Sequence, residues 1–174
     1  MDNENASTKT SILFVCHGNI CRSPMAEFVM KRLVRDSGVE EKFWIESAAV
    51  STEEIGNPVY PPVYRLLLRH GIDSSGKRAR QITVRDLETF DYIVLMDENN
   101  FRYLRPMLSK GMDSWDPQPE HRRFKKISLL MDYTETPHGI ADPWYTRDFE
   151  ATFDDVNLGC SEFLKRMLTG RKLP

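Results

Sequence analysis

The stretch Phe14–Pro24, which reads FVCHGNICRSP, decides the fold of this chain. An apolar run over residues 12–15 stops at a cysteine, and Pro24 opens a segment with helical spacing. This order predicts a buried strand, a tight loop and a helix. Backbone N–H groups of such a loop, together with the N-terminus of the helix, can surround the oxygens of a phosphate. The stretch therefore predicts a binding site for a phosphoryl group.

Three side chains of this loop have the chemistry that phosphoryl transfer requires. Cys16 lies at the bottom of the predicted loop, where positive potential favours the nucleophilic thiolate. Arg22 can bind two phosphate oxygens through its planar guanidinium, and Ser23 can donate a hydrogen bond to the thiolate. A cysteine at a strand end is commonly an inert buried residue. The five intervening residues followed by Arg-Ser favour a catalytic cysteine instead.

The residues between Cys16 and Arg22 complete the predicted phosphate-binding loop, which includes Gly18 and Ile20. Asn19 tolerates left-handed dihedral angles and would hold the loop in shape. His17 is expected to face solvent rather than to act as a base. Cys21 has two open interpretations: a core cysteine, or a resolving thiol that traps oxidised Cys16 as a disulfide.

A reaction at the thiolate also needs a proton donor for the leaving oxygen, and Asp142 is the candidate. It lies in a predicted loop over residues 132–145, after the fourth predicted strand, where parallel-sheet enzymes gather their sites. Pro143 would restrain this loop, and Trp144 and Tyr145 would form an apolar wall. The competing interpretation is an ordinary Asp-Pro turn.

Strand and helix patterns alternate along the rest of the chain, which predicts an α/β fold with a parallel sheet covered on both faces. The predicted strands are residues 12–15, 43–46, 92–96 and 127–130. The predicted helices are residues 25–36, 63–70, 98–108 and 149–168, with a short helix capped by Thr83. Residues 1–10 read as a flexible polar lead-in, and residues 11–174 as a single domain.

Composition excludes several classes of function. The net charge of −2 argues against non-specific binding to nucleic acid, and no apolar run is long enough to span a membrane. The three cysteines are too few for a secreted disulfide framework, so a reducing cytoplasm is expected. Cys160 falls at a buried position of the last helix and is expected to be inert. Zinc binding by Cys16, His17 and Cys21 is disfavoured, because their spacing does not suit a closed tetrahedral site.

These motifs resemble the low-molecular-weight protein tyrosine phosphatases. Residues 15–24 fit the signature Val-Cys-x-Gly-Asn-x-Cys-Arg-Ser-Pro of that family in full. Further matches follow in order along nearly the whole chain. They are Ser47-Ala48, His70-Gly71-Ile72, residues 79–83, residues 90–93, Met96-Asp97-Glu98 and residues 142–145.

The resemblance implies a three-layer, Rossmann-like or flavodoxin-like domain with a four-stranded parallel sheet. It implies hydrolysis of protein phosphotyrosine, with Cys16 forming a cysteinyl-phosphate and Arg22 binding the phosphate. Ser23 would stabilise the thiolate, while Asp142 would protonate the leaving phenol and then activate water. No metal or organic cofactor is implied, and the partners are phosphotyrosine proteins or peptides.

The resemblance also assigns supporting residues. Asn19, His70 and Ser47 would belong to the hydrogen-bond network that shapes the loop. Cys21 would be the redox partner of Cys16, which makes the nucleophile a redox-sensitive cysteine. The chain is expected to act as a monomer.

The chain departs from the family pattern at three places, two of which belong to the predicted wall around the substrate. Ala49 stands where a glycine is usual, and Glu53 stands where the family has the aromatic residue that flanks the substrate ring. A carboxylate there predicts weaker ring stacking and a preference for a basic group beside the phosphotyrosine. Tyr60, at the start of Tyr60-Pro61-Pro62 in place of the usual Asp-x-Arg, is an alternative source of the missing ring.

Three other functions compete on the same scaffold. The resemblance implies that a protein-arginine phosphatase would have a threonine at the loop position of Ile20. This apolar residue suits an aromatic ester better. An arsenate reductase needs a further resolving cysteine in a flexible segment, for which Cys160 is a poor candidate. A non-catalytic phosphate-binding or redox-sensing module is disfavoured by the joint presence of the four predicted catalytic residues.

Overall fold

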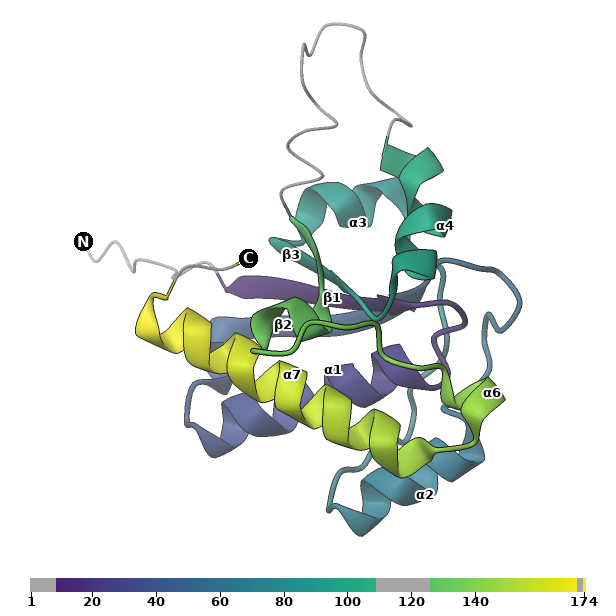
Figure 1. Cartoon of the computed structure of the whole chain (residues 1–174), viewed down its shortest axis with the longest axis horizontal. Coiled ribbons are helices and arrows are strands. Elements are labelled where there is room, and N and C mark those ends of the chain that lie inside the picture. Colours follow the sequence, from purple (N-terminus) through teal and green to yellow (C-terminus); the bar gives the residue numbers. More distant parts are fainter. Residues whose placement is uncertain (1–8, 109–125, 172–173) are drawn as a thin grey trace, which may run out of the picture.

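A parallel sheet between two layers of helices forms the protein in the computed structural model, which describes residues 9–108, 126–171 and 174 (Figure 1). The strands within this part of the chain are β1 (Thr10–Cys16), β2 (Phe43–Ala49), β3 (Tyr92–Leu95) and β4 (Ile127–Leu129). Their order is β2-β1-β3-β4, and all neighbouring strands are parallel. The predicted α/β class and parallel sheet are confirmed. The sequence also predicts a loop at residues 111–123, which contains Pro117 and Pro119. This segment and most of the lead-in at 1–10 lie outside the described residues.

The two faces of the sheet carry different helices (Figure 1). One face is covered by α1 (Arg22–Asp36), α2 (Pro61–Arg69) and α7 (Phe149–Thr169), and the other by α3 (Val84–Thr89) and α4 (Glu98–Leu108). The short elements are η1 (Glu40–Lys42), η2 (Leu130–Tyr133) and α6 (Pro143–Thr146).

The central strand β1 is buried on both faces. Ile12 and Phe14 pack into the core cluster on the α1 and α7 side, whereas Leu13 and Val15 pack into the cluster on the α3 and α4 side. All four side chains are fully buried. This explains why the strand reads as a continuous apolar run rather than as an alternating one.

Several element ends differ from the sequence prediction, and three of these differences lie at the site. Helix α1 begins at Arg22, directly after the loop, because the Met25 N–H already donates to the Cys21 carbonyl at 3.1 Å. Strand β2 continues past residue 46 to Ala49, where it still pairs with Cys16. The predicted loop at 132–145 contains the single turn α6, whose N-terminus is capped by Asp142.

The strand order places the carboxyl ends of β1 and β3 beside a topological switch point. Chain connections leave β1 toward β2 on one side, and β3 lies on its other side. In open α/β sheets, ligands bind in the crevice that forms at such a point. Cys16 ends β1 and Asp97 follows β3, so both residues lie at this end of the sheet.

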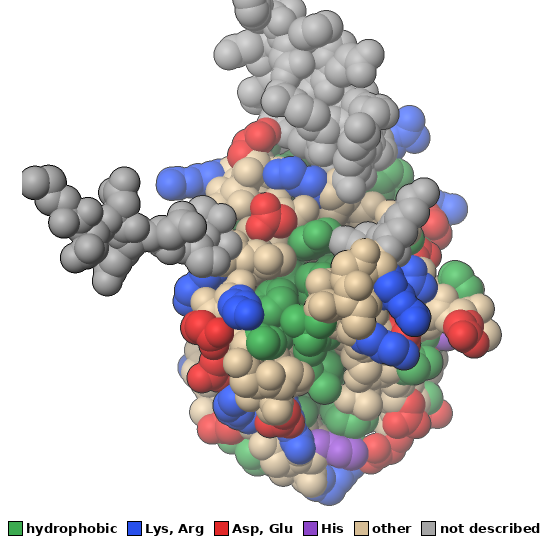
Figure 2. All heavy atoms as spheres, turned by 90° about the vertical axis from the view of Figure 1, so that its left-hand side faces the viewer, with side chains coloured by type: hydrophobic (Ala, Val, Ile, Leu, Met, Phe, Trp, Pro, Cys, Tyr) green, Lys and Arg blue, Asp and Glu red, His purple; other side chains and the backbone are tan. Residues whose placement is uncertain are grey.

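The opposite end of the sheet has a different surface. Thr10, Phe43 and Tyr92 begin the first three strands, and together with Met167 and Leu168 of α7 they line a shallow pocket there. Figure 2 shows this face, where hydrophobic side chains gather between charged ones. In the described part of the chain, no helix is both long and apolar enough to cross a membrane.

Candidate active site

The loop after β1 wraps around the sulfur of Cys16. Cys16 is the last residue of β1 and is almost fully buried. Its Sγ lies 3.0 Å from Ser23 Oγ and accepts a hydrogen bond from the backbone N–H of Asn19 at 3.3 Å. Asn19 has a φ of 59°, in the left-handed region that asparagine tolerates well and that permits this tight turn. The thiol therefore lies at the base of a loop that surrounds it with donors.

The side chain of Asn19 ties this loop to two other segments. Its Nδ2 donates to Ser23 Oγ at 2.8 Å and to Ser47 Oγ at 2.9 Å. Its Oδ1 accepts from the backbone N–H of Arg80 at 3.1 Å. Since Nδ2 has two hydrogens and both are used, the two serine oxygens act as acceptors in these bonds.

The hydroxyl hydrogen of Ser23 is consequently available for another partner. Two acceptors lie within reach, the Cys16 sulfur at 3.0 Å and the Ala48 carbonyl at 3.3 Å. A negatively charged sulfur is the stronger acceptor of the two. The geometry therefore suits Ser23 to stabilise a thiolate at Cys16.

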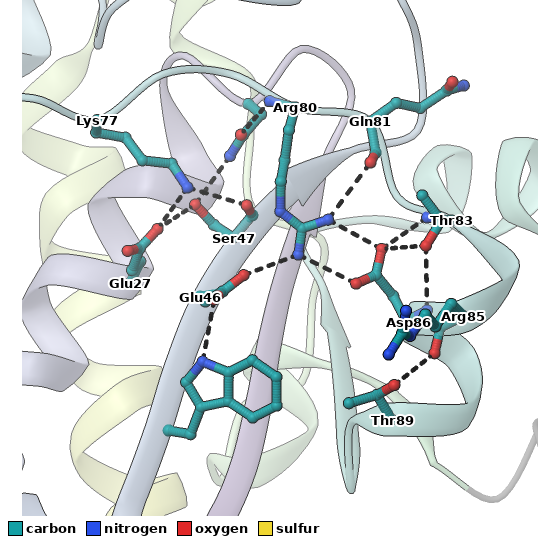
Figure 3. Close-up of polar contacts among 12 residues, drawn as sticks. Glu27, Glu46, Ser47, Lys77, Arg80, Gln81, Thr83, Arg85, Asp86 and Thr89 are labelled. Carbon is teal, nitrogen blue, oxygen red and sulfur yellow. Dashed lines mark hydrogen bonds and ion pairs between the residues drawn. The ribbon is translucent and has the colours of Figure 1, made fainter.

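Ser47 donates its own hydrogen to a buried carboxylate, Glu27, at 2.5 Å (Figure 3). Lys77 Nζ lies 2.9 Å from the same carboxylate and donates to the Ser47 carbonyl, and Lys31 approaches the other oxygen at 2.6 Å. Burial alone would raise the pKa of Glu27, but the charges of Lys77 and Lys31 outweigh it, so this pKa lies below its usual value. Glu27 is therefore an anion that fixes the orientation of the Ser47 hydroxyl.

Sequence reasoning missed Glu27 and Lys77 as parts of the site. A signal for Glu27 exists, because it follows Ser23 by one helical turn and so lies on the same face of α1. No local pattern pairs Lys77 with residues of α1.

His70 lies outside the hydrogen-bond network of Asn19, Ser47 and Glu27. The residue caps α2, its ring stacks on Phe153 of α7 at 4.0 Å, and its Nε2 lies 4.0 Å from Glu150. Its expected place beside Ser47 is taken by Glu27 and Lys77. The expectation that His70 supports the loop is therefore corrected, because α2 ends on the α7 side of the molecule.

Arg22 is buried and held by three oxygen acceptors. Its Nη1 bonds Asp97 and the Ile140 carbonyl, the latter at 3.0 Å, and its Nη2 donates to Asp142 Oδ2 at 2.8 Å. Burial lowers the pKa of Arg22, but the charges of Cys16, Asp142 and Asp97 outweigh this effect and raise it above its usual value. The guanidinium is thus permanently charged. Asp97 was missed as a site residue, although its place directly after β3 could have indicated it.

Asp142 lies across the site from Cys16, at the N-terminus of α6. Its Oδ1 accepts from the Trp144 N–H at 3.0 Å, while Oδ2 contacts Arg22. Pro143 occupies the first position of α6, where its missing N–H leaves no unpaired donor. The backbone of α6 and the side chain of Arg22 therefore hold the predicted acid at the pocket.

Cys16, Arg22 and Asp142 line one pocket of about 180 Å³. The described residues around it come from the loop, from the segment after β2 and from α6. They are Cys16, His17, Gly18, Ile20, Cys21, Arg22, Glu53, Glu54, Asp142, Trp144 and Tyr145.

Only part of the predicted substrate wall lines the pocket. Glu53, Trp144 and Tyr145 line the pocket, and Tyr145 is 82% exposed. Tyr60 does not line it: its ring lies 5.2 Å from that of Trp144, and its hydroxyl accepts from Arg147 at 2.9 Å. Tyr60 thus supports the wall rather than replacing the missing ring.

The three cysteines of the chain are all buried and free. Burial raises the pKa of Cys21, with further contributions from the charges of Cys16 and Asp142. Burial likewise raises the pKa of Cys160, which keeps that thiol protonated. In the residues that the structure describes, no group of three or more His, Cys, Asp or Glu side chains could hold a metal ion.

Fold and site together define a class: an α/β protein with a thiol at the base of an anion-binding loop and a carboxyl group facing it. Residues 11–172 match the model of the family described as low molecular weight phosphotyrosine protein phosphatase. The chain belongs to this family.

Individual relatives agree with this assignment. The chain is 36% identical to the low molecular weight protein-tyrosine-phosphatase YfkJ of Bacillus subtilis, over 94% of this chain and 99% of that protein. The crystal structure of YfkJ has a TM-score of 0.83 and covers 96% of this chain and 99% of its own. A Gallus gallus low molecular weight phosphotyrosine protein phosphatase is 43% identical, over 90% and 94% of the two chains. The crystal structure of DARP, a Drosophila arginine phosphatase, is 31% identical, with a TM-score of 0.77 and coverage of 90% and 96%.

Proposed function

We propose that this protein hydrolyses phosphotyrosine in proteins or peptides through a cysteinyl-phosphate intermediate. The observation that carries the proposal is the geometry around Cys16: its sulfur lies 3.0 Å from Ser23 Oγ, beneath a loop closed by a charged, buried Arg22. The names of the relatives from Bacillus subtilis and Gallus gallus support the same substrate.

The first half of the reaction transfers the phosphoryl group to sulfur. Phosphate oxygens bind the loop N–H groups and Arg22, where they compete with Asp142 for Nη2. The Cys16 thiolate attacks phosphorus, a sulfur–phosphorus bond forms, and the bond from phosphorus to the phenol oxygen breaks. Asp142 donates its proton to that oxygen, so the leaving group departs as a neutral phenol.

The second half regenerates the enzyme. Asp142, now a carboxylate, accepts a proton from a water molecule that attacks phosphorus. The sulfur–phosphorus bond breaks, inorganic phosphate leaves, and Cys16 returns as a thiolate stabilised by Ser23. Arg22 stabilises the charge on the equatorial oxygens in both transition states.

A protein-arginine phosphatase is the second candidate, because the Drosophila neighbour is described as an arginine phosphatase. The pocket favours the aromatic ester, since Ile20 and Trp144 present apolar surface beside the phosphate loop. A guanidinium leaving group would instead need polar acceptors at those positions.

The proposal is tested by assaying peptides of one sequence that carry phosphotyrosine, phosphoserine or phosphoarginine. We expect turnover of phosphotyrosine to exceed that of the other two. Cys16→Ser should abolish turnover, whereas Cys160→Ala, a change at a cysteine remote from the loop, should keep it. Faster turnover of phosphoarginine would establish the second candidate. Binding of phosphopeptides without hydrolysis would indicate a non-catalytic module.

We also infer reversible oxidation of the nucleophile. Peroxide would convert the Cys16 thiolate to a sulfenic acid, and attack by the Cys21 sulfur would form a disulfide and release water. The same proposal places the protein in the cytoplasm, which the three free cysteines support, and expects a monomer. Treatment with peroxide and then a thiol should restore activity, and the Cys21→Ser variant should recover less of it. Light scattering measures the oligomeric state.

A further inference from the structure

The mouth of the pocket is acidic. Among the described residues that line it, Glu53, Glu54 and Asp142 are carboxylates, and Arg22 is the one lysine or arginine. The guanidinium of Arg22 is only 3% exposed and already contacts Asp97 and Asp142. It neutralises charge at the base of the pocket and leaves the carboxylates at the rim without a fixed cation from the pocket lining.

Glu54 is the carboxylate best placed to act on a bound substrate. Its Cγ lies 3.2 Å from the position that a Cβ on Gly18 would occupy, so its side chain rests directly on the phosphate loop. Asn57 Nδ2 donates to Glu54 Oε2 at 2.6 Å and holds the carboxylate in place. The charge of Glu54 also acts on the loop. The pKa of Cys21 is raised mainly by burial and by the charges of Cys16 and Asp142, and Glu54 makes a smaller contribution in the same direction.

Glu53 extends this acidic rim outward. Its side chain is 69% exposed, and its Oε2 lies 3.1 Å from His17 Nε2. The ring of His17 is also in edge contact with Tyr103 at 5.1 Å, which fixes the position of the pair. Because Glu54 rests on the phosphate loop whereas Glu53 is largely exposed, Glu54 is expected to contribute the larger share of the electrostatic field at a bound phosphate.

A negative rim opposes the binding of a phosphate dianion unless the substrate brings positive charge with it. A lysine or arginine beside the phosphotyrosine would offset this repulsion and would pair with the carboxylates as the phosphate enters the loop. An aspartate or glutamate at the same place would add to the repulsion.

We propose that Glu53 and Glu54 select phosphotyrosine sites flanked by lysine or arginine. The inference rests on the proposed phosphotyrosine phosphatase activity and names its substrate class. Ion pairs at an exposed rim are individually weak, so two of them predict a preference of roughly three- to tenfold in kcat/KM for a basic over an acidic peptide.

The test uses phosphotyrosine peptides that differ only in the flanking residues, which are lysine, glutamine or glutamate. The kcat/KM values should fall in that order at low ionic strength, and the differences should shrink in high salt. The charge-neutral variants Glu54→Gln and Glu53→Gln should each reduce the ratio between basic and acidic peptides, and the double variant should bring it near one. Glu41→Gln is the matched control, because Glu41 is exposed in η1, at the opposite end of the sheet.

The outcomes separate this inference from the proposed function. Equal kcat/KM for the three peptides, or a preference that persists in the double variant, would overturn the inference and leave the phosphatase activity standing. No turnover of any phosphotyrosine peptide would contradict the proposed function and the inference together. A phosphoarginine peptide that reacts fastest, and loses its rate in Glu54→Gln, would show that the rim binds the scissile guanidinium instead.

Discussion

The two carboxylate oxygens of Asp142 have different partners, and this difference suits the residue to its proposed role. Oδ1 accepts from the Trp144 N–H and fixes the carboxylate to α6. Oδ2 contacts Arg22 Nη2, the group that a phosphate would bind. When phosphate takes that donor, Oδ2 is released while Oδ1 keeps its position. In the proposed reaction, the carboxyl group would then face the leaving oxygen without a rearrangement of its loop.

We therefore expect replacement of Asp142 by asparagine to lower the rate of the chemical step more than it weakens substrate binding. Asp142→Asn keeps the cap on α6 but cannot donate a proton to the leaving group. We expect kcat to fall by about 100-fold for phenyl phosphate, whose leaving group needs a proton, and far less for p-nitrophenyl phosphate. Single-turnover rates with the two esters measure this, and an equal loss for both would exclude Asp142 as the acid.

At the scale of single residues, the sequence predicts the members of the phosphate loop well, but it predicts the residues that hold the loop in place poorly. Cys16, Asn19, Arg22 and Ser23 all fall within residues 16–23, so their spacing alone indicates the chemistry. Asp97 and Glu27 act through contacts with residues remote in sequence or one helical turn away, and no motif combines them into one site. The resemblance to the family, which the comparisons confirm, assigned the supporting role to His70, whereas the structure gives that position to Glu27 and Lys77.

Among the elements, α7 packs so closely on η2 that one glycine is required. A Cβ on Gly159 would lie 2.6 Å from Leu130 Cγ, and Leu130 is fully buried. Gly159→Ala gains up to about 1 kcal/mol of helix propensity but must displace this side chain, which costs roughly 1–3 kcal/mol. We expect a net loss of stability in urea unfolding. Asn157→Ala, at an exposed position of the same helix, is the control and should be neutral or slightly stabilising.

The ion pair between α1 and the segment at Lys77 makes stability depend on pH (Figure 3). The pKa of Glu27 is lowered in the folded protein from a reference value of 4.5. Its contribution is therefore fully present above that value and is lost as the pH falls through the lower folded pKa. Glu27→Gln should cost on the order of 3 kcal/mol at neutral pH, because it leaves Lys77 buried beside an amide. The difference from the wild type should shrink below about pH 4.5.

Asp36→Asn is the matched control for this experiment. Asp36 pairs with Arg32 on the exposed side of α1, with 56% of its side chain accessible. Its loss should change unfolding free energy by less than about 1 kcal/mol. A pH profile of Glu27→Gln that runs parallel to the wild type would contradict the assigned ion pair.

Element types follow from the sequence more reliably than their ends do. The apolar strands and amphipathic helices of the described residues lie where their periodicity predicts. Their ends depend on contacts that periodicity does not contain, such as the pairing of Ala49 with Cys16 and the capping of α6 by Asp142.

At the scale of the whole molecule, the two ends of the sheet have different surfaces, of which Figure 2 shows the one at the amino ends of the strands. The carboxyl ends of β1 and β3 hold the charged site, and the amino ends of the strands hold the shallow pocket lined by Phe43, Tyr92 and Leu168. Substitutions at one end can therefore be compared with controls at the other, as Glu41 is used above. The parallel order of the strands, which the alternating pattern predicts, creates this separation.

The bond from the Arg80 N–H to Asn19 Oδ1 has a consequence for the exchange of backbone hydrogens with solvent. Ala49 donates to the Arg80 carbonyl at 2.7 Å, and Ile82 donates to the Ala49 carbonyl at 2.8 Å. These three amides should open as one unit with the loop around Cys16. Asn19→Gly, which keeps the left-handed backbone but removes the acceptor, should speed deuterium uptake at all three and leave Val94 in β3 unchanged. Mass spectrometry would thus detect loosening of the loop before any loss of global stability.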